Sequence, residues 1–188
     1  NMDAANPVGL RGIEFTEFNS KDKNWLHTIF SNFGFSKVGI HSKNNSDLYV
    51  QNGINFIVNN SAESFSNEFE KMHGPCISSM GWKVDNAEEA FKVAVERGAK
   101  PAETQDYFYT NGEKVPAIMG IGDSIIYFIE ENAAKDAYKN LGFTKHPEPE
   151  MVKSKGFLLI DHLTNNVESG KMEFWADFYK NIFGFTEV

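Results

Sequence analysis

The sequence predicts an α+β fold built from tandem βαβββ modules, and three observations lead to this expectation. Two distant segments repeat each other, a tight-turn dipeptide joins two short apolar runs, and single amphipathic helices alternate with groups of predicted strands. Of the 188 residues, 41% are hydrophobic and 23% are charged, as in ordinary folded proteins. We therefore expect a packed chain in which one supersecondary unit is used more than once.

The internal repeat keeps a constant offset of 150 residues. Its first copy contains Trp25 and Phe33-Gly34-Phe35, and its last copy contains Trp175 and Phe183-Gly184-Phe185. The first copy reads as a strand at 12–18 and a helix that ends at Gly34, a residue suited to the left-handed end of a helix. Three short strands follow, at 35–40, 48–51 and 54–59, and Asn52-Gly53 joins the last two as a tight hairpin.

A second copy occupies the middle of the chain. It reads as a strand at 79–84 and a helix at 87–97, with Asn86 and Glu89 placed to cap the start of the helix. Extended segments follow at 115–119 and 124–130, and we interpret Gly120-Ile121-Gly122 between them as a hairpin turn, because a phosphate loop would need a helix after it. This copy also fits βαβββ.

Two segments lie outside these copies. Phe65, Phe69 and Met72 are spaced as on one side of a helix, which predicts a short inserted helix after Ser61 that covers one side of the sheet. Residues 131–155 contain Pro147 and Pro149 and read as a connection to a new domain. A third copy then begins at Gly156. We expect an N-terminal domain at 1–150 and the truncated start of a second domain at 151–188.

Composition excludes several classes of partner. A formal net charge of −8 leaves no basic excess for phosphate groups, so nucleic acid and anionic membrane surfaces are not expected as partners. No apolar stretch approaches the length of a membrane span or a signal peptide. Cys76 is the single cysteine, which excludes an intrachain disulfide and favours the reducing cytoplasm.

Four segments carry a resemblance to a known family: 6–18, 47–60, 73–75 and 160–167. They are similar to bacterial 4-hydroxyphenylpyruvate dioxygenases, members of the vicinal oxygen chelate superfamily, whose tandem βαβββ modules form half-open, glyoxalase-like barrels. The resemblance implies a metal-free N-terminal barrel and a C-terminal barrel that holds Fe(II) through two His and one Glu. It also implies a homo-oligomer that converts 4-hydroxyphenylpyruvate and O₂ to homogentisate and CO₂ in tyrosine and phenylalanine catabolism.

His162, in Asp161-His162-Leu163-Thr164, corresponds to the first iron ligand of that family. Strand alternation places His162 on one face with Ile160 and Thr164, which would be the barrel interior. The second His and the Glu would lie beyond Val188, so we expect no catalytic residue in the chain itself, no stably bound iron and no turnover. A lone His in a strand is otherwise more often a packed or hydrogen-bonded residue.

Other candidate sites favour structural interpretations. Phe15 stands in the strand position that corresponds to His162, and the middle copy has Met80 to Trp82 there, so neither offers a metal ligand. Glu130 lies where related barrels place a carboxylate ligand, but alone it reads as a solvated strand end. His73 and Cys76 flank a Gly-Pro turn and lack the partners of a metal or nucleophile site. The aromatic run from Phe174 to Phe183 reads as core.

Two alternative functions stay open on the sequence. One is a sister enzyme that uses the same substrate and iron to make hydroxymandelate, and nothing in these residues separates the two products. The other belongs to a different class: a metal-free module that binds a small molecule, as some barrels of the superfamily do. Tight binding of a ligand by residues 1–150 without iron would favour the second alternative.

Overall fold

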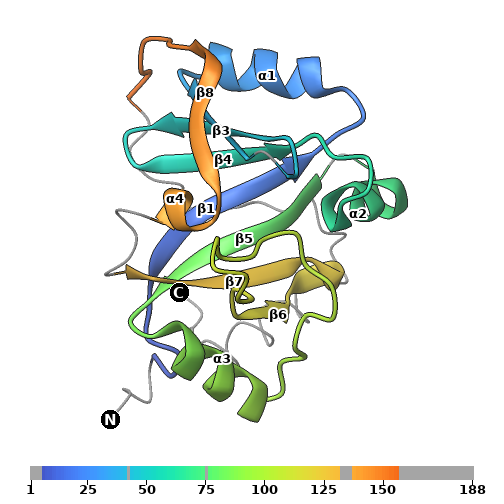
Figure 1. The fold of residues 1–188 in the computed structure, drawn as a ribbon, viewed down its shortest axis with the longest axis vertical. Helices are drawn as coiled ribbons and strands as arrows, with labels where there is room; N and C mark the ends of the chain where they lie inside the picture. Colours follow the sequence, from blue (N-terminus) through green and yellow to red (C-terminus); the bar gives the residue numbers. More distant parts are fainter. Residues whose placement is uncertain (1–5, 42, 75, 132–136, 157–188) are drawn as a thin grey trace.

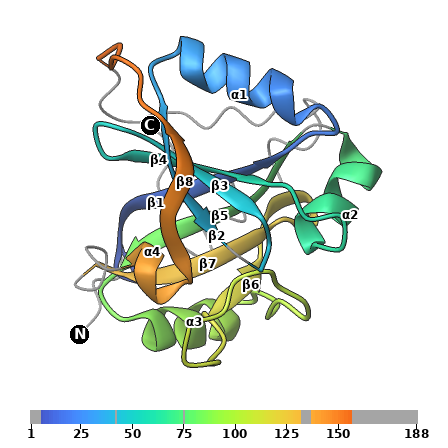
Figure 2. The ribbon, with the colours of Figure 1, turned by 45° about the horizontal axis from the view of Figure 1, so that its top comes forward.

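Eight strands of the computed structural model form one sheet in the order β6-β7-β5-β1-β4-β3-β2-β8 (Figure 1). The structure describes residues 6–41, 43–74, 76–131 and 137–156. Figures 1 and 2 both place helices α1 and α3 at opposite ends of this sheet. No helix in these ranges is long and apolar enough to cross a membrane.

The first module has the predicted order of one strand, one helix and three strands. Its elements are β1 (Leu10–Asn19), α1 (Lys23–Asn32), β2 (Ser36–His41), β3 (Ser46–Gln51) and β4 (Ile54–Asn59). β4 pairs in parallel with β1, and β3 pairs antiparallel with β2 and β4. Asn52 and Gly53 both have positive φ, 48° and 82°, as a two-residue hairpin turn of the predicted kind requires. The prediction for this module is confirmed.

The second module departs from the prediction at one strand. Its elements are β5 (Cys76–Val84), α3 (Ala87–Glu96), β6 (Ala117–Met119) and β7 (Ile125–Glu130). β7 pairs in parallel with β5, and β5 pairs antiparallel with β1, so the two modules share one sheet. Within the described ranges, the first of the three expected strands after α3 is reduced to an isolated bridge between Pro101 and Ile118. The two extended segments predicted after this helix, at 115–119 and 124–130, are confirmed as β6 and β7, and the remaining strand of the βαβββ pattern is shortened at Pro101, which has no N–H for a strand ladder.

Residues 131–155, interpreted from the sequence as a connection, contain helix α4 (Ala137–Asn140) and strand β8 (Phe143–Glu150). β8 pairs antiparallel with β2 at the edge of the sheet. Its Pro147 and Pro149 argued against a strand, but an edge strand tolerates proline because one side of its backbone has no neighbour. Beyond β8, the backbone N–H of Val152 donates a hydrogen bond to the Ser36 hydroxyl, and the backbone N–H of Lys155 donates one to the Gln51 side-chain oxygen. The chain after β8 therefore stays in contact with the first module.

Helix α2 (Phe65–His73) and the short 3₁₀ turn η1 (Ile121–Asp123) complete the described elements. Both were expected, α2 as the inserted helix and η1 as the turn between β6 and β7. The stripe predicted for α2 holds in part, since Phe69 is buried while Met72 is 81% exposed. Two residues that define the internal repeat, Trp25 on α1 and Phe33 just after it, are also half exposed, so the repeat does not mark the core alone.

Alternation along the strands separates three clusters of buried apolar residues. One lies under α3 and contains Trp82 and Phe128, and one lies under α1 and contains Phe30 and Tyr49. The third lies on the other face of the sheet, where Tyr127 and Ile129 flank Phe128 in sequence but point the opposite way. Its members are Phe15, Leu48, Ile57, Tyr107, Val115, Ala117, Ile125, Tyr127, Ile129, Ala137, Leu141 and Phe143. We call this third cluster the inner face.

Candidate functional site

Aromatic side chains fill the inner face around Phe15, the residue whose strand position corresponds to that of His162 in the repeat. Phe15 is 1% exposed and packs against both Tyr107 and Tyr127, with ring centroids 6.0 Å away in each case, while the two tyrosine rings lie 5.5 Å from each other. Its neighbour on β5 is Gly81, and a Cβ at Gly81 would overlap the Phe15 ring. The two strands that join the modules therefore meet around a packed phenyl ring.

The described residues do not form a metal site. Within those ranges, no three His, Cys, Asp or Glu side chains come together as potential ligands. Glu130, the carboxylate considered as a ligand, accepts a hydrogen bond of 3.2 Å from the backbone N–H of Ala87, the first residue of α3. In this structure Glu130 is therefore a helix-end contact at the end of β7.

His73 and Cys76 also have structural roles, as the sequence indicated. His73 ends α2, and Gly74 follows with a φ of 77° before β5 begins at Cys76. Burial raises the pKa of the Cys76 thiol to about 11, which keeps it protonated at neutral pH and unreactive as a nucleophile.

A buried carboxyl group that the sequence reasoning missed lies two residues beyond Phe15. Glu17 is completely buried, and its side chain is surrounded by hydrogen-bond donors. Ser79 and Ser78 donate to Oε1 at 2.8 and 3.2 Å, Asn59 donates to Oε2 at 3.2 Å, and the Tyr107 hydroxyl also donates to Oε2. Both serines reach Glu17 because the pairing of β1 and β5 shifts register just after this residue.

A second carboxyl group, Asp106, fastens the segment between α3 and β6 to the start of α2. Its side chain accepts hydrogen bonds from the backbone N–H groups of Phe65 and Ser66 at 2.8 and 3.0 Å. Its own backbone N–H donates to the Tyr127 hydroxyl at 3.0 Å. A carboxylate suits the first turn of a helix, where backbone N–H groups lack partners within the helix.

The two carboxyl groups are electrostatically linked. The pKa of Glu17 is raised from 4.5 to about 7, mainly by burial and secondly by the nearby Asp106, while the hydrogen bonds from Tyr107, Ser79 and Asn59 oppose the rise. Burial also raises the pKa of Asp106, against the bonds from Phe65 and Ser66. Glu17 therefore ionises near neutral pH, although burial in the protein interior disfavours the charged form of a carboxyl group.

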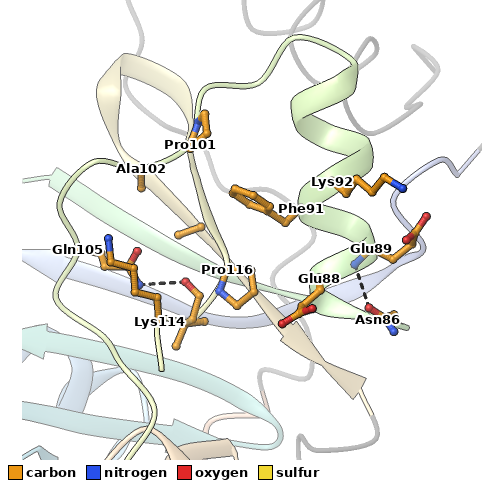
Figure 3. Close-up of a pocket in the computed structure, with 12 residues that line it drawn as sticks. Asn86, Glu88, Glu89, Phe91, Lys92, Pro101, Ala102, Gln105, Lys114 and Pro116 are labelled. Atoms are coloured by element: carbon orange, nitrogen blue, oxygen red, sulfur yellow. Dashed lines mark hydrogen bonds between the residues drawn. The ribbon is translucent and has the colours of Figure 1, made fainter. Parts of the chain in front are cut away.

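The segment that carries Asp106 and Tyr107, residues 101–116, forms a wall of three hollows. One, of about 760 Å³, lies between this segment and helix α3, and Figure 3 shows Phe91 of α3 pointing toward the segment that carries Pro101 and Gln105. A second, of about 580 Å³, adjoins it, and a third, of about 680 Å³, lies between the segment and β8. Gln105 holds the segment in shape by donating to the backbone oxygens of Tyr107 and Val115, both at 2.9 Å.

His162, the ligand predicted from the resemblance, lies outside the described residues, as do the rest of the third copy after Gly156 and the aromatic run from Phe174 to Phe183. The residues that sequence reasoning missed are Glu17 and Asp106. Alternation offered a signal for Glu17, because it places this charged residue on the same strand face as the buried Phe15. No comparable signal existed for Asp106, which lies in an irregular segment.

The fold defines a class of protein. Two βαβ-based modules, joined through antiparallel pairing of their first strands and curved around a shared inner face, form the half-open barrel of vicinal oxygen chelate proteins. Residues 4–144 match the family described as "Hydroxyphenylpyruvate dioxygenase, HPPD, N-terminal". The chain belongs to this family.

Curated relatives agree with this assignment. Protein MelA of Shewanella colwelliana is 51% identical over 185 residues, which cover 97% of this chain and 52% of MelA. The 4-hydroxyphenylpyruvate dioxygenase of Legionella pneumophila (strain Philadelphia 1) is 39% identical over 188 residues, which cover 100% of this chain and 52% of that enzyme. The chain therefore spans about half the length of these relatives.

Solved structures show the same fold. A fusion protein of a xylose isomerase-like TIM barrel and a 4-hydroxyphenylpyruvate dioxygenase matches with a TM-score of 0.79 and 24% identity, over 96% of this chain and 29% of that one. A mutant of the 4-hydroxymandelate synthase of Streptomyces coelicolor matches with a TM-score of 0.71 and 16% identity, over 96% and 54% of the two chains. At these identities the likeness concerns the fold alone.

Proposed function

We propose that this chain is the N-terminal part of an Fe(II)-dependent dioxygenase that converts 4-hydroxyphenylpyruvate and O₂ to homogentisate and CO₂ in tyrosine and phenylalanine catabolism. The observation that carries the proposal is the family match over residues 4–144. The 39% identity to an enzyme named for this substrate, over the whole chain, supports it. By the same family resemblance, we place the protein in the cytoplasm as a homo-oligomer.

In this proposal the iron does not belong to the barrel described here. The inner face is filled by Phe15 and its aromatic neighbours, and its carboxyl groups are occupied by hydrogen bonds. Residues 1–150 would form a metal-free domain, and 151–188 would open a second domain in which His162 is one iron ligand. A second His and a Glu would follow Val188. When bound to these three ligands, Fe(II) would supply the oxidative chemistry on the α-keto acid and O₂.

The proposal is tested by product analysis of the complete polypeptide encoded by the gene. Purified protein is supplied with Fe(II) and 4-hydroxyphenylpyruvate, oxygen uptake is followed, and the products are separated by chromatography. We expect homogentisate and one CO₂ for each O₂ consumed. Hydroxymandelate as the product would assign the sister activity instead, and no oxygen uptake would contradict both. The 188-residue chain alone is expected to show no uptake above background.

A metal-free binding function is the second candidate, and the hollow of about 680 Å³ beside β8 favours it. Lys43 and Lys139 lie on its wall with Phe108, whose side chain is 39% exposed, so cationic and aromatic groups meet there. Such a lining suits an aromatic anion. Calorimetric titration of the chain with 4-hydroxyphenylpyruvate, without iron, tests this function. Tight binding that K43E and K139E weaken would support it, and no binding would eliminate it.

A further inference from the structure

Two buried carboxyl groups from distant parts of the chain share one donor. The Asn59 side-chain amide lies 3.2 Å from Glu17 Oε2 and 3.5 Å from Asp106 Oδ2. Glu17 comes from β1 and Asp106 from the 101–116 segment, so one amide bridges the sheet and the segment that covers it. Two carboxylates that share a buried site repel each other, since little solvent is present to screen them.

Few groups around this pair could neutralise a second negative charge. From the 101–116 segment and β7, Tyr107 and Tyr127 face Glu17, and their pKa values are raised well above 10, so both stay neutral. From β2, His41 contacts the Tyr107 ring, and its Nδ1 accepts from Asn44 while Nε2 donates to Leu141, so it is neutral as well.

Hydrogen bonds connect the pair to a cation on α1, Lys23. The Lys23 ammonium group donates a hydrogen bond to the Asn19 side chain. From Asn19, a chain of hydrogen bonds runs through the hydroxyls of Ser66 and Ser78 to Glu17, so three side chains separate the ammonium group from the pair. The Lys23 ammonium interacts electrostatically with Glu70 of α2 first, then with Glu17, and then with Cys76 of β5. Its charge is therefore shared with Glu70 and offsets the charge of the pair only in part.

The contacts of Asp106 determine what the pair controls. Its side chain holds the first two N–H groups of α2, and its backbone holds the segment to Tyr127 on β7. The same segment supplies walls to all three hollows described above. A change in the attachment of Asp106 would therefore alter both the start of α2 and the shape of those hollows.

We propose that Glu17 and Asp106 form a proton-linked latch, which holds the 101–116 segment and the start of α2 on the sheet while Glu17 is protonated and loosens them when both carboxyls are ionised. A protonated Glu17 leaves Asp106 as the single charge, stabilised by α2. Ionisation of Glu17 places a second charge across the Asn59 bridge. The loosening is therefore expected as pH rises through neutrality, in line with the raised pKa of Glu17.

Hydrogen exchange of the 188-residue chain between pH 5 and 8 tests the latch. The measured quantities are the protection factors of the Phe65, Ser66 and Asp106 amides, corrected for the intrinsic pH dependence of exchange. We expect protection at these amides to fall about tenfold across neutral pH, because local opening is coupled to ionisation of Glu17. Amides in the centre of β3 serve as an internal reference and are expected to keep constant protection.

Matched variants separate a latch from general destabilisation. In E17Q the protection at these amides should not depend on pH. In E14Q the dependence should persist, because Glu14 is a second buried carboxyl on β1 but is paired with Lys83. Persistence of the pH dependence in E17Q, or its loss in E14Q, would overturn the proposal.

Two further variants keep the proposal testable if E17Q does not fold. Y107F removes a donor that favours ionised Glu17, so the midpoint of loosening should move to higher pH. D106N removes the neighbouring charge, so the Glu17 carboxyl, followed by carbon-13 NMR, should titrate at lower pH. Shifts of these midpoints in one common direction, or no shift, would contradict the latch. The inference does not depend on iron or on the proposed reaction.

Discussion

The two modules of the barrel share a βαβββ pattern in the sequence but differ in the segments after their helices. In the first module, three strands come after α1, and a two-residue turn at Asn52-Gly53 joins the last two. In the second, an isolated bridge and the irregular 101–116 segment take the place of one strand. The segment that replaces the strand carries Asp106 and Tyr107 and borders the hollows. The regular module thus provides Glu17 and Asn59 on paired strands, and the irregular one provides Asp106 and Tyr107 on the segment that covers them.

The difference also separates two kinds of energetic control. Strand pairing and apolar packing hold the first module, and their strength varies little with pH. The covering segment of the second module is held by hydrogen bonds to buried carboxyl groups, whose strength depends on their charge. Variants that act on one module and spare the other can therefore test the comparison.

The largest expected effect is at the joint between the modules. G81V would place side-chain atoms where the Phe15 ring lies, so β1 and β5 could not keep their spacing. We expect a loss of more than about 3 kcal/mol in the free energy of unfolding, measured by urea denaturation. The double variant F15A/G81V should recover part of this loss. Full additivity of the two single effects would show that the contact does not matter.

A smaller effect is expected from pH. Because the pKa of Glu17 is raised from 4.5 to about 7, its contribution to stability is fully present below pH 4.5 and is lost as pH rises to about 7. The wild-type free energy of unfolding should therefore fall by about 3 kcal/mol over this window relative to that of E17Q. Denaturation curves at several pH values give this difference, and a rise in relative stability would contradict the assignment.

Glycine substitutions compare the turns of the two modules directly. Gly53 and Gly112 both have positive φ, 82° and 90°, so alanine at either position is strained by about 1 kcal/mol. G53A acts on two paired strands and should lower global stability. G112A acts within the 101–116 segment and should mainly increase its hydrogen exchange. Equal global losses for the two variants would mean that the segment unfolds only with the sheet.

The smallest expected effect concerns the start of α3. The Asn86 side chain accepts a hydrogen bond of 2.9 Å from the backbone N–H of Glu89, as Figure 3 shows. N86A should lower the free energy of unfolding by about 1 kcal/mol or slightly less. N86D, which keeps the acceptor, is the control and should retain wild-type stability in thermal denaturation. If N86A and N86D lost similar amounts of stability, the effect would not come from the helix cap.

Much of the fold was predictable because its signals are local. The Asn52-Gly53 turn, the Asn86 cap and the helical spacing in both modules depend on residues close in sequence, and the structure confirms them. Strand β8 was missed because Pro147 and Pro149 argue against a central strand, and sequence does not reveal that this strand lies at an edge.

The polar groups of the inner face were harder to predict. Glu17 is recognisable as a charged residue on an apolar strand face, but its donors come from β4, β5 and the 101–116 segment. Asp106 acts through contacts with α2, about forty residues away in sequence. Such long-range pairs arise from the packing of the sheet, which a single sequence does not specify.

The central claim is that the described barrel is metal-free and that His162 belongs to a separate iron site. The most direct test is the iron content of the complete polypeptide after reconstitution with Fe(II), measured by metal analysis for wild type, H162A and E17Q. We predict one iron per chain in wild type and in E17Q, and loss of iron in H162A. Iron retained in H162A, or lost in E17Q while the fold is intact, would contradict the account.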